Sequence, residues 1–213
     1  MRNPAHLCLV RHGETAWNAE GRVQGQTDVP LNERGQAQAR AVGAALAAEA
    51  FAAIYSSDLQ RVTQTAAPAA RALGLEVARD AALRERHFGM FETLTYAEVK
   101  AKHPGEYARF AAKELDYDFR GGESLRAFNA RVLECIRALA GRHAGERVLV
   151  FTHGGVLEMV YRYANNAGLS TPRDFEIPNA AINRVEIAVD AWRVLAWAER
   201  GHLDTALDDL TEV

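Results

Sequence analysis

Short apolar runs alternate along the chain with longer stretches of helix-forming residues. A run that is apolar at every position predicts a strand covered on both faces, which is typical of parallel sheets. Between the runs, residues 125–139 carry apolar side chains at spacings of three and four, as one face of a helix does. The alternation predicts an α/β sandwich with a mostly parallel sheet. The expected strands are residues 6–10, 51–55 and 147–151, and the expected helices are residues 32–50, 57–74, 125–141 and 156–164.

Individual residues predict where these helices begin, bend and end. Ser57 and Asp58 have side chains that commonly cap the first turn of a helix, so we expect a helix to begin there. Pro68 should kink that helix, because proline removes a backbone hydrogen bond from a helix interior. Gly141 should end the helix that starts near residue 125.

Three segments differ from this alternating plan. Residues 86–122 are charged, aromatic-rich and interrupted by prolines and glycines, which favours a helical insertion that covers a site; we call it the lid insertion. The apolar runs 182–187 and 192–198 predict a closing hairpin at the edge of the sheet. The acidic tail, residues 204–212, is expected to be a solvated end.

Composition and charge narrow the class of protein. The chain has 213 residues, 48% of them hydrophobic, and its 25 basic and 28 acidic residues give a net charge of −3. This size predicts a single domain spanning residues 1–213. Without a basic run we expect no nucleic-acid partner, and no apolar stretch approaches the roughly 20 residues that span a bilayer. A homodimer through the hairpin or the lid insertion is left open.

The two cysteines, Cys8 and Cys135, lie far apart and outside any CxxC motif. This pattern supports neither a disulfide framework nor a thiolate zinc site, and it favours a reducing compartment. Because the N-terminus also lacks a signal-peptide core, the expected location is the cytoplasm.

The residues that suggest chemistry follow the expected strands. Arg11 and His12 come directly after the first strand, and His153 follows a later one, so all three should emerge at the same edge of a parallel sheet. A neutral imidazole is a competent nucleophile, and an arginine fork matches phosphate oxygens. Arg61, near the start of another helix, is a second such donor. Glu85 opens the lid insertion and is the candidate acid for a leaving alkoxide. These side chains together predict a pocket for a phosphoryl group.

The same residues belong to a longer pattern that resembles the histidine phosphatase superfamily, also called phosphoglycerate mutase-like. The resemblance covers almost the whole chain in the expected order. It rests on the segments Leu9–Thr15, Asn18, Gln24–Gly25, Asp28, Pro30–Leu31, Gly35, Gln38–Ala39, Ser56–Thr65, Glu85, Phe88–Gly89, Gly122–Ser124 and Thr152–Gly155.

This resemblance implies a three-layer α/β/α fold and a mechanism that uses neither metal nor cofactor. It implies that His12 is the nucleophile that becomes phosphohistidine, and that Glu85 donates and later accepts a proton. Arg11, Arg61 and His153 would complete the phosphate pocket. Further contacts to the phosphate are expected from Asn18 and the backbone amide of Gly154, with Thr15 and Gln24 flanking the pocket.

The family divides between phosphatases, which transfer the phosphoryl group to water, and mutases, which return it to a hydroxyl of a bound glycerate. Where cofactor-dependent mutases have a Tyr, a Lys and an Arg pair, this chain has Phe88 and Tyr96 and no Arg pair in the lid insertion. The missing positive charge favours a phosphatase of small phosphorylated metabolites. A phosphoglycerate mutase, an alpha-ribazole-phosphate phosphatase, a sugar-bisphosphate phosphatase and a phosphate-binding module without catalysis are the alternatives.

Two features of the lid insertion bear on the choice of substrate. Its aromatic residues suggest a less charged or cyclic leaving group, or else they form the insertion's own core. Many relatives have Glu-Gly where this chain has Glu92-Thr93, so the backbone there is expected to lack a glycine conformation.

Overall fold

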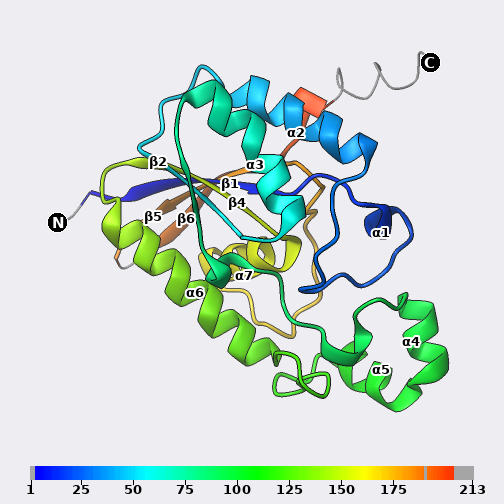
Figure 1. Ribbon diagram of the computed structural model, residues 1–213. Coiled ribbons are helices and arrows are strands. Elements are labelled where there is room, and N and C mark those ends of the chain that lie inside the picture. Colours follow the sequence, from blue (N-terminus) through cyan, green and yellow to red (C-terminus); the bar gives the residue numbers. More distant parts are fainter. Residues whose placement is uncertain (1–2, 190, 204–213) are drawn as a thin grey trace.

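Six strands form one sheet in the order β3-β2-β4-β1-β5-β6 in the computed structural model, which describes residues 3–189 and 191–203 (Figure 1). Strands β3, β2, β4 and β1 are parallel, and β5 is antiparallel to both of its neighbours. The mostly parallel sheet is therefore confirmed. The strands are β1 (Ala5–Arg11), β2 (Ala53–Ser56), β3 (Val77–Arg79), β4 (Arg147–Thr152), β5 (Ile182–Ile187) and β6 (Trp192–Glu199).

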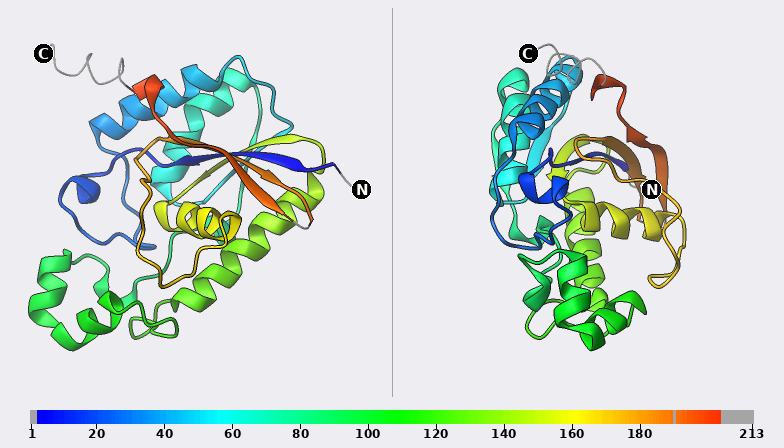
Figure 2. Two further views of the ribbon diagram at one scale, coloured as in Figure 1. Left: turned by 180° about the vertical axis from the view of Figure 1, so that it is seen from behind. Right: turned by 90° about the vertical axis from the view of Figure 1, so that its right-hand side faces the viewer.

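Helices cover both faces of this sheet and complete the three-layer sandwich (Figure 2). Along β1, Leu7 and Leu9 pack in one apolar cluster with helices α6 and α7, whereas Cys8 and Val10 pack in another with α2 and α3. This division follows from the alternation of side chains along a strand. The helices are α1 (Ala16–Ala19), α2 (Glu33–Leu46), α3 (Gln60–Leu73), α4 (Tyr96–Lys102), α5 (Pro104–Ala111), α6 (Leu125–Arg142) and α7 (Gly154–Ala164).

The start of α3 differs from the expectation. Its N-cap is Leu59, which makes no side-chain cap, and the Gln60 amide instead donates to Asp28 Oδ1 at 2.7 Å. Asp58 forms an ion pair with Arg84 at 2.5 Å, and Ser57 is bound inside the candidate site described below. Both side chains were therefore wrongly predicted to be caps, because they are used by long-range contacts.

The expectation that Gly141 ends α6 is wrong by one residue, and the kink expected at Pro68 stays a prediction. Helix α3 continues through Pro68, and α6 continues past Gly141 to Arg142. Pro68 faces Gly43 of α2, where an added Cβ would lie 2.9 Å from the proline ring. The small residue thus lets the two helices pack closely. Edge strand β3 gave no sequence signal, since it is three residues long and largely exposed.

The lid insertion contains α4 and α5 and extends beyond one end of the sandwich (Figure 1). Its own apolar cluster includes the buried rings of Phe91, Tyr117 and Phe119. The predicted hairpin at the sheet edge is confirmed by β5 and β6. The acidic tail lies outside the described residues.

The backbone at Thr93 corrects another expectation, because it keeps the conformation that a glycine would adopt. Thr93 has φ of 72°, in the left-handed region that β-branched residues rarely occupy. Its amide donates to the Val23 carbonyl at 2.9 Å, and the Arg22 side chain donates to its carbonyl. These contacts hold the strained residue where the lid insertion meets residues 22–23.

Replacing this exposed threonine by glycine should stabilise the protein. A left-handed backbone costs a residue with a Cβ about 1–2 kcal/mol, which glycine avoids. Glycine also has greater conformational freedom in the unfolded chain, and this offsets about 0.5–1 kcal/mol of the gain. We therefore expect Thr93→Gly to raise the free energy of unfolding by about 0.5–1 kcal/mol in urea denaturation. Thr93→Ala keeps a Cβ and is the control; an equal gain from alanine would contradict the explanation by strain.

Candidate active site

The parallel pairing of β1 with β4 brings the predicted residues together. Arg11, the last residue of β1, is paired with Thr152, the last residue of β4. The chain therefore leaves the two strands side by side, with His12 on one side and His153 on the other. Their imidazole rings are edge to face with centroids 5.3 Å apart. The expectation that both histidines share one edge of the sheet is confirmed.

His12 is held as a neutral imidazole with one free nitrogen. Its Nδ1 lies 2.7 Å from the Gly13 carbonyl oxygen. Because a carbonyl only accepts, Nδ1 must carry the proton, and Nε2 is left with an unshared electron pair. The His12 pKa is lowered well below its usual value by burial, with Arg61 and Arg11 lowering it further. This is the protonation state that a nucleophile requires.

Three neighbours fix the loop that carries His12. The Gly13 amide donates to Thr65 Oγ1 at 2.9 Å, and Asn179 Nδ2 donates to the His12 carbonyl at 3.0 Å. A Cβ on Gly13 would lie 2.6 Å from the Gly35 carbonyl oxygen, so only glycine fits between the loop and α2. Sequence analysis did not predict Asn179, which lies 167 positions from His12 in a segment without a regular pattern.

His153 is fully buried and is positioned by Ser57. Its Nε2 lies 2.9 Å from Ser57 Oγ, and its Nδ1 has no partner among the described residues. Burial lowers the His153 pKa well below its usual value, and the positive charges of Arg61 and Arg11 lower it further. His153 is also the N-cap residue of α7, which begins at Gly154.

The two arginines are anchored to backbone oxygens and keep part of each guanidinium unpaired. Arg61 donates to the Thr27 carbonyl at 2.9 Å and to the Gly25 carbonyl at 2.7 Å. Arg11 donates to the Ile177 carbonyl at 2.5 Å. Burial lowers the pKa of each arginine to about 10, so both stay charged at neutral pH.

Three buried nitrogens around His12 thus have no partner among the described residues: Nε of Arg11, Nε of Arg61 and Nδ1 of His153. Unpaired buried polar atoms are rare in native proteins and need an explanation. The two charged guanidinium groups beside a neutral imidazole provide an explanation, because these groups match the oxygens of a phosphoryl group.

The carboxyl group of Glu85 is fixed at the start of α7. Its Oε2 accepts from the Gly155 amide at 2.9 Å, and its Oε1 accepts from the Arg86 amide at 2.8 Å. A Cβ on Gly155 would lie 2.1 Å from Glu85 Oε1. The second glycine of the Thr-His-Gly-Gly segment therefore provides the space that this carboxyl group occupies.

A cavity of about 360 Å³ connects most of the predicted residues. Two predicted residues, Thr15 and His153, do not line it. Thr15 is fully buried and donates to Gln24 Oε1 at 3.0 Å, and it also caps α1 by accepting from the Asn18 amide. Thr15 thus supports the wall without lining the cavity, and the fully buried ring of His153 lies beside that of His12, which does line it. The predicted residues that line the cavity are Arg11, His12, Asn18, Gln24, Arg61, Glu85 and Gly154.

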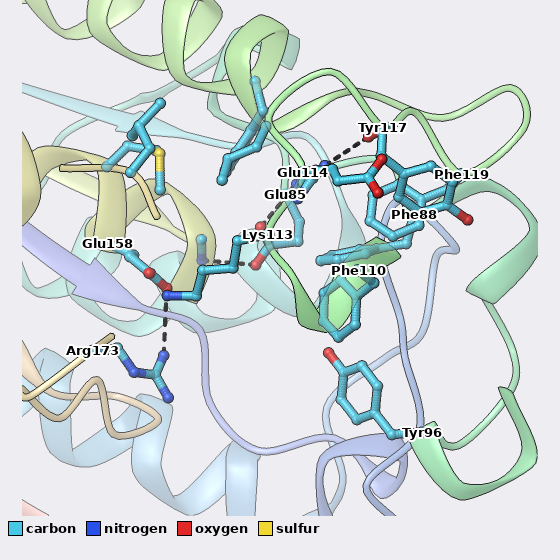
Figure 3. Close-up of a pocket in the computed structure, with 16 residues that line it drawn as sticks. Glu85, Phe88, Tyr96, Phe110, Lys113, Glu114, Tyr117, Phe119, Glu158 and Arg173 are labelled. Carbon is cyan, nitrogen blue, oxygen red and sulfur yellow. Dashed lines mark hydrogen bonds and ion pairs between the residues drawn. The ribbon is translucent and has the colours of Figure 1, made fainter. Parts of the chain in front are cut away.

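A second cavity of about 270 Å³ continues from the first beneath the lid insertion (Figure 3). Glu85, Phe88 and Tyr96 line both cavities. Phe91 is buried in the insertion's own core, whereas Phe88, Tyr96 and Phe110 are surfaces of the cavity. The aromatic residues therefore form the insertion's own core in part, and a less charged or cyclic leaving group stays a prediction.

The described residues hold neither a preformed metal site nor a membrane-spanning helix. No described group of three or more His, Cys, Asp or Glu side chains is arranged to hold a metal ion. Among the helices that the structure describes, none is long and apolar enough to cross a membrane.

A mostly parallel α/β sheet with a cationic pocket around a neutral histidine fits a protein that handles phosphoryl groups. The chain belongs to the histidine phosphatase superfamily, branch 1, whose family model matches residues 7–200. Two curated relatives come from Arabidopsis thaliana. Phosphoglycerate mutase-like protein 4 is 38% identical over 204 residues, covering 94% of this chain and 87% of the relative. Metal-independent phosphoserine phosphatase is 38% identical over 205 residues, covering 93% of this chain and 83% of the relative.

The solved structure of a relative with 30% sequence identity confirms the fold. The mycobacterial glucosyl-3-phosphoglycerate phosphatase, in complex with VO3, superimposes with a TM-score of 0.82 at 30% identity. The match covers 94% of this chain and 100% of that one. Family and relatives together show an enzyme of the phosphatase or mutase type.

The contrast between two adjacent glycines tests the role of the space beside Glu85. Gly155→Ala should displace the carboxyl group and lower kcat for an alkyl phosphomonoester by about 10- to 100-fold, as expected for a misplaced acid. Gly154→Ala is the matched control, because its Cβ would make only an ordinary 3.4 Å contact with Arg11 Nε. Thermal unfolding should show both variants folded. Equal losses in the two variants would refute the proposed packing.

Stability should fall on mild acidification because the two site histidines stay neutral in the folded protein. Below pH 6.5 the unfolded chain binds protons at these histidines that the folded protein does not, so unfolding becomes easier as the pH decreases. The expected slope is about 1.4 kcal/mol per pH unit for each histidine. Urea denaturation between about pH 7.5 and 5.5, in buffer free of phosphate, measures it. His12→Asn should remove about half of the slope; an unchanged slope would contradict this assignment.

Proposed function

We propose that the protein is a metal-independent phosphomonoesterase that hydrolyses small phosphorylated metabolites through a phosphohistidine intermediate on His12. The observation that carries the proposal is the neutral His12 ring, with Nε2 unprotonated, beside the unpaired nitrogens of Arg11, Arg61 and His153. Every group that the reaction needs comes from the chain itself. The phosphoserine phosphatase and glucosyl-3-phosphoglycerate phosphatase relatives support hydrolysis of small molecules.

In the first step, His12 Nε2 attacks phosphorus and the bond from phosphorus to the leaving oxygen breaks. Glu85 acts as the acid that gives a proton to that oxygen, and Arg11 and Arg61 stabilise the charge on the equatorial oxygens. In the second step, Glu85 takes a proton from water as the water oxygen attacks phosphorus. The nitrogen–phosphorus bond then breaks, which restores neutral His12 and protonated Glu85.

Ser57 gives His153 a fixed tautomer in this mechanism. The oxygens of a phosphate dianion accept hydrogen bonds, so His153 contributes only if Nδ1 carries a proton. In the neutral ring Nε2 is then an acceptor, and the Ser57 hydroxyl, 2.9 Å away, donates to it. The buried His153 can therefore bind an anion without first becoming charged.

The aromatic side of the cavity beyond Glu85 supports transfer to water over transfer to a bound glycerate, but Lys113 and Arg173 on its other side correct the expectation that this region lacks positive charge. Phe88 and Tyr96 line both the cavity that contains His12 and the cavity beneath the lid insertion, and Phe110 lines the second one. Phosphoglycerate mutase activity is the alternative, supported by the mutase-like relative. Hydrolysis of alpha-ribazole phosphate is the alternative within the same chemistry.

The decisive measurement is phosphate release in the presence of EDTA from p-nitrophenyl phosphate, alpha-ribazole phosphate and 3-phosphoglycerate. We expect hydrolysis without conversion of 3-phosphoglycerate into 2-phosphoglycerate, and loss of hydrolysis in His12→Ala. Fast isomerisation would make the protein a mutase. Turnover of His12→Ala at the wild-type rate would refute the phosphohistidine mechanism.

A further inference from the structure

The segment Gly122–Ser124 belongs to the pattern that the chain shares with the histidine phosphatase superfamily, but the proposed mechanism does not use it. Two of its residues shape the chain. Ser124 caps α6, and a Cβ on Gly122 would lie 2.4 Å from the His87 carbonyl oxygen. The third residue, Glu123, makes contacts that lead to the loop of the proposed acid.

Glu123 and Arg131 of α6 form an ion pair with two parallel hydrogen bonds. Arg131 Nε donates to Glu123 Oε1 at 2.8 Å, and Arg131 Nη2 donates to Glu123 Oε2 at 2.7 Å. Two bonds between a guanidinium fork and a carboxylate fix both direction and distance. Burial opposes the charged form of Glu123, but hydrogen bonds from Arg131 and from the His87 amide lower its pKa. The pair is therefore charged at neutral pH.

The remaining donors of Arg131 hold the backbone that carries Glu85. Its Nη1 donates to the Ala82 carbonyl at 2.8 Å and to the Arg84 carbonyl at 3.0 Å. Its Nη2 donates to the Glu85 carbonyl at 3.3 Å. All five N–H groups of the guanidinium are therefore used, two on the carboxylate and three on backbone oxygens. One side chain from α6 thus fixes this backbone at three points.

Glu123 holds the next two residues of the same loop. Its Oε2 accepts from the His87 amide at 3.0 Å, and its own amide donates to the His87 carbonyl at 2.8 Å. Its carbonyl accepts from Arg86 Nε at 2.9 Å. The Arg86 amide, which donates to Glu85 Oε1, therefore lies in backbone that is fixed on both sides.

We propose that Arg131 and Glu123 are positioning residues, which hold the Glu85 carboxyl group where it can protonate the leaving oxygen. The inference rests on the proposed function, in which Glu85 is the acid. Neither Arg131 nor Glu123 lines either cavity at the site, so both act through Glu85 and not on the substrate. Position matters because an acid acts only within hydrogen-bond reach of the leaving oxygen, and a displacement of about 1 Å costs about 100-fold in rate.

Two substrates separate the placement of the acid from a general loss of structure. The alkoxide of glycerol 1-phosphate is a poor leaving group that needs a proton, whereas p-nitrophenolate hardly needs one. The quantity compared is kcat/KM, because it covers the steps up to phosphorylation of His12 and is independent of the later attack by water. We expect Arg131→Lys to lower kcat/KM about 10- to 100-fold for glycerol 1-phosphate and less than about threefold for p-nitrophenyl phosphate.

Lysine is the informative replacement because it has three donors in place of five and keeps the positive charge. Burial lowers the His153 pKa and the charge of Arg131 adds to that effect, so this charge should stay. Arg126→Lys is the matched control, because Arg126 makes a similar pair with Asp116 on the exposed surface of the same helix, with bonds of 2.8 and 3.2 Å. It should leave kcat/KM unchanged for both substrates.

Glu85→Gln tests the coupling between the acid and the pair. By itself it should show the same selective loss on glycerol 1-phosphate. Arg131→Lys added to Glu85→Gln should cause no further selective loss, because no acid remains to be positioned. Glu123→Gln keeps the size of the side chain but only one acceptor oxygen, and it should repeat the selective loss. Thermal unfolding should show every variant folded.

Equal losses on both substrates, or no loss on either, in Arg131→Lys would overturn the inference and leave the phosphatase mechanism intact. A further selective loss in the double variant would overturn it as well. If Arg131→Lys does not fold, the selectivity of Glu123→Gln decides the inference by the same criterion. Equal losses on both substrates in Glu85→Gln would instead refute the role of Glu85 in the proposed function.

Discussion

The parallel pairing of β1 with β4 is the constraint on which the rest of the site depends. It aligns the ends of two strands whose paired residues are 141 positions apart, so that Arg11 lies beside Thr152 and the two histidines follow next to each other. Both strands are covered by helices on each face, which fixes them firmly. The loops that leave them can therefore hold strained or unpaired groups without loss of the fold.

Positive charge is concentrated at this edge at a cost in folding energy. Arg11 and Arg61 lie beside two buried histidines, and the proximity of these cations makes protonation of either ring unfavourable. Backbone carbonyls of Gly25, Thr27 and Ile177 compensate part of the burial of the guanidinium groups. The burial cost that remains uncompensated favours the binding of an anion, because a phosphoryl group would relieve the repulsion and pair with the unpaired nitrogens.

Local sequence signals predicted the centre of the site, and long-range contacts decided what they missed. His12 and His153 follow apolar runs directly, so their positions could be derived from the strands. Ser57 stands at a strand–helix junction and was interpreted as a cap, but its partner His153 is 96 positions away. Asn179 and Arg173 lie in an irregular segment, where no periodicity indicates which way a side chain faces. Their roles depend on how that segment folds across the ends of the strands.

The first turn of helix α7 determines the distance between the two ends of the cavity. Gly154 lies at the phosphate end and Glu158 at the far end, and four residues of an α-helix span only about 6 Å. The start of the helix is fixed, because the Gly155 amide donates to Glu85 and the Leu157 amide donates to the His153 carbonyl. Within the helix, Arg162 Nε donates to Glu158 Oε1 and holds that side chain. An insertion or deletion in this single turn would rotate Glu158 away from the cavity and change the span that a substrate must bridge, while β4 and its histidine stayed in place.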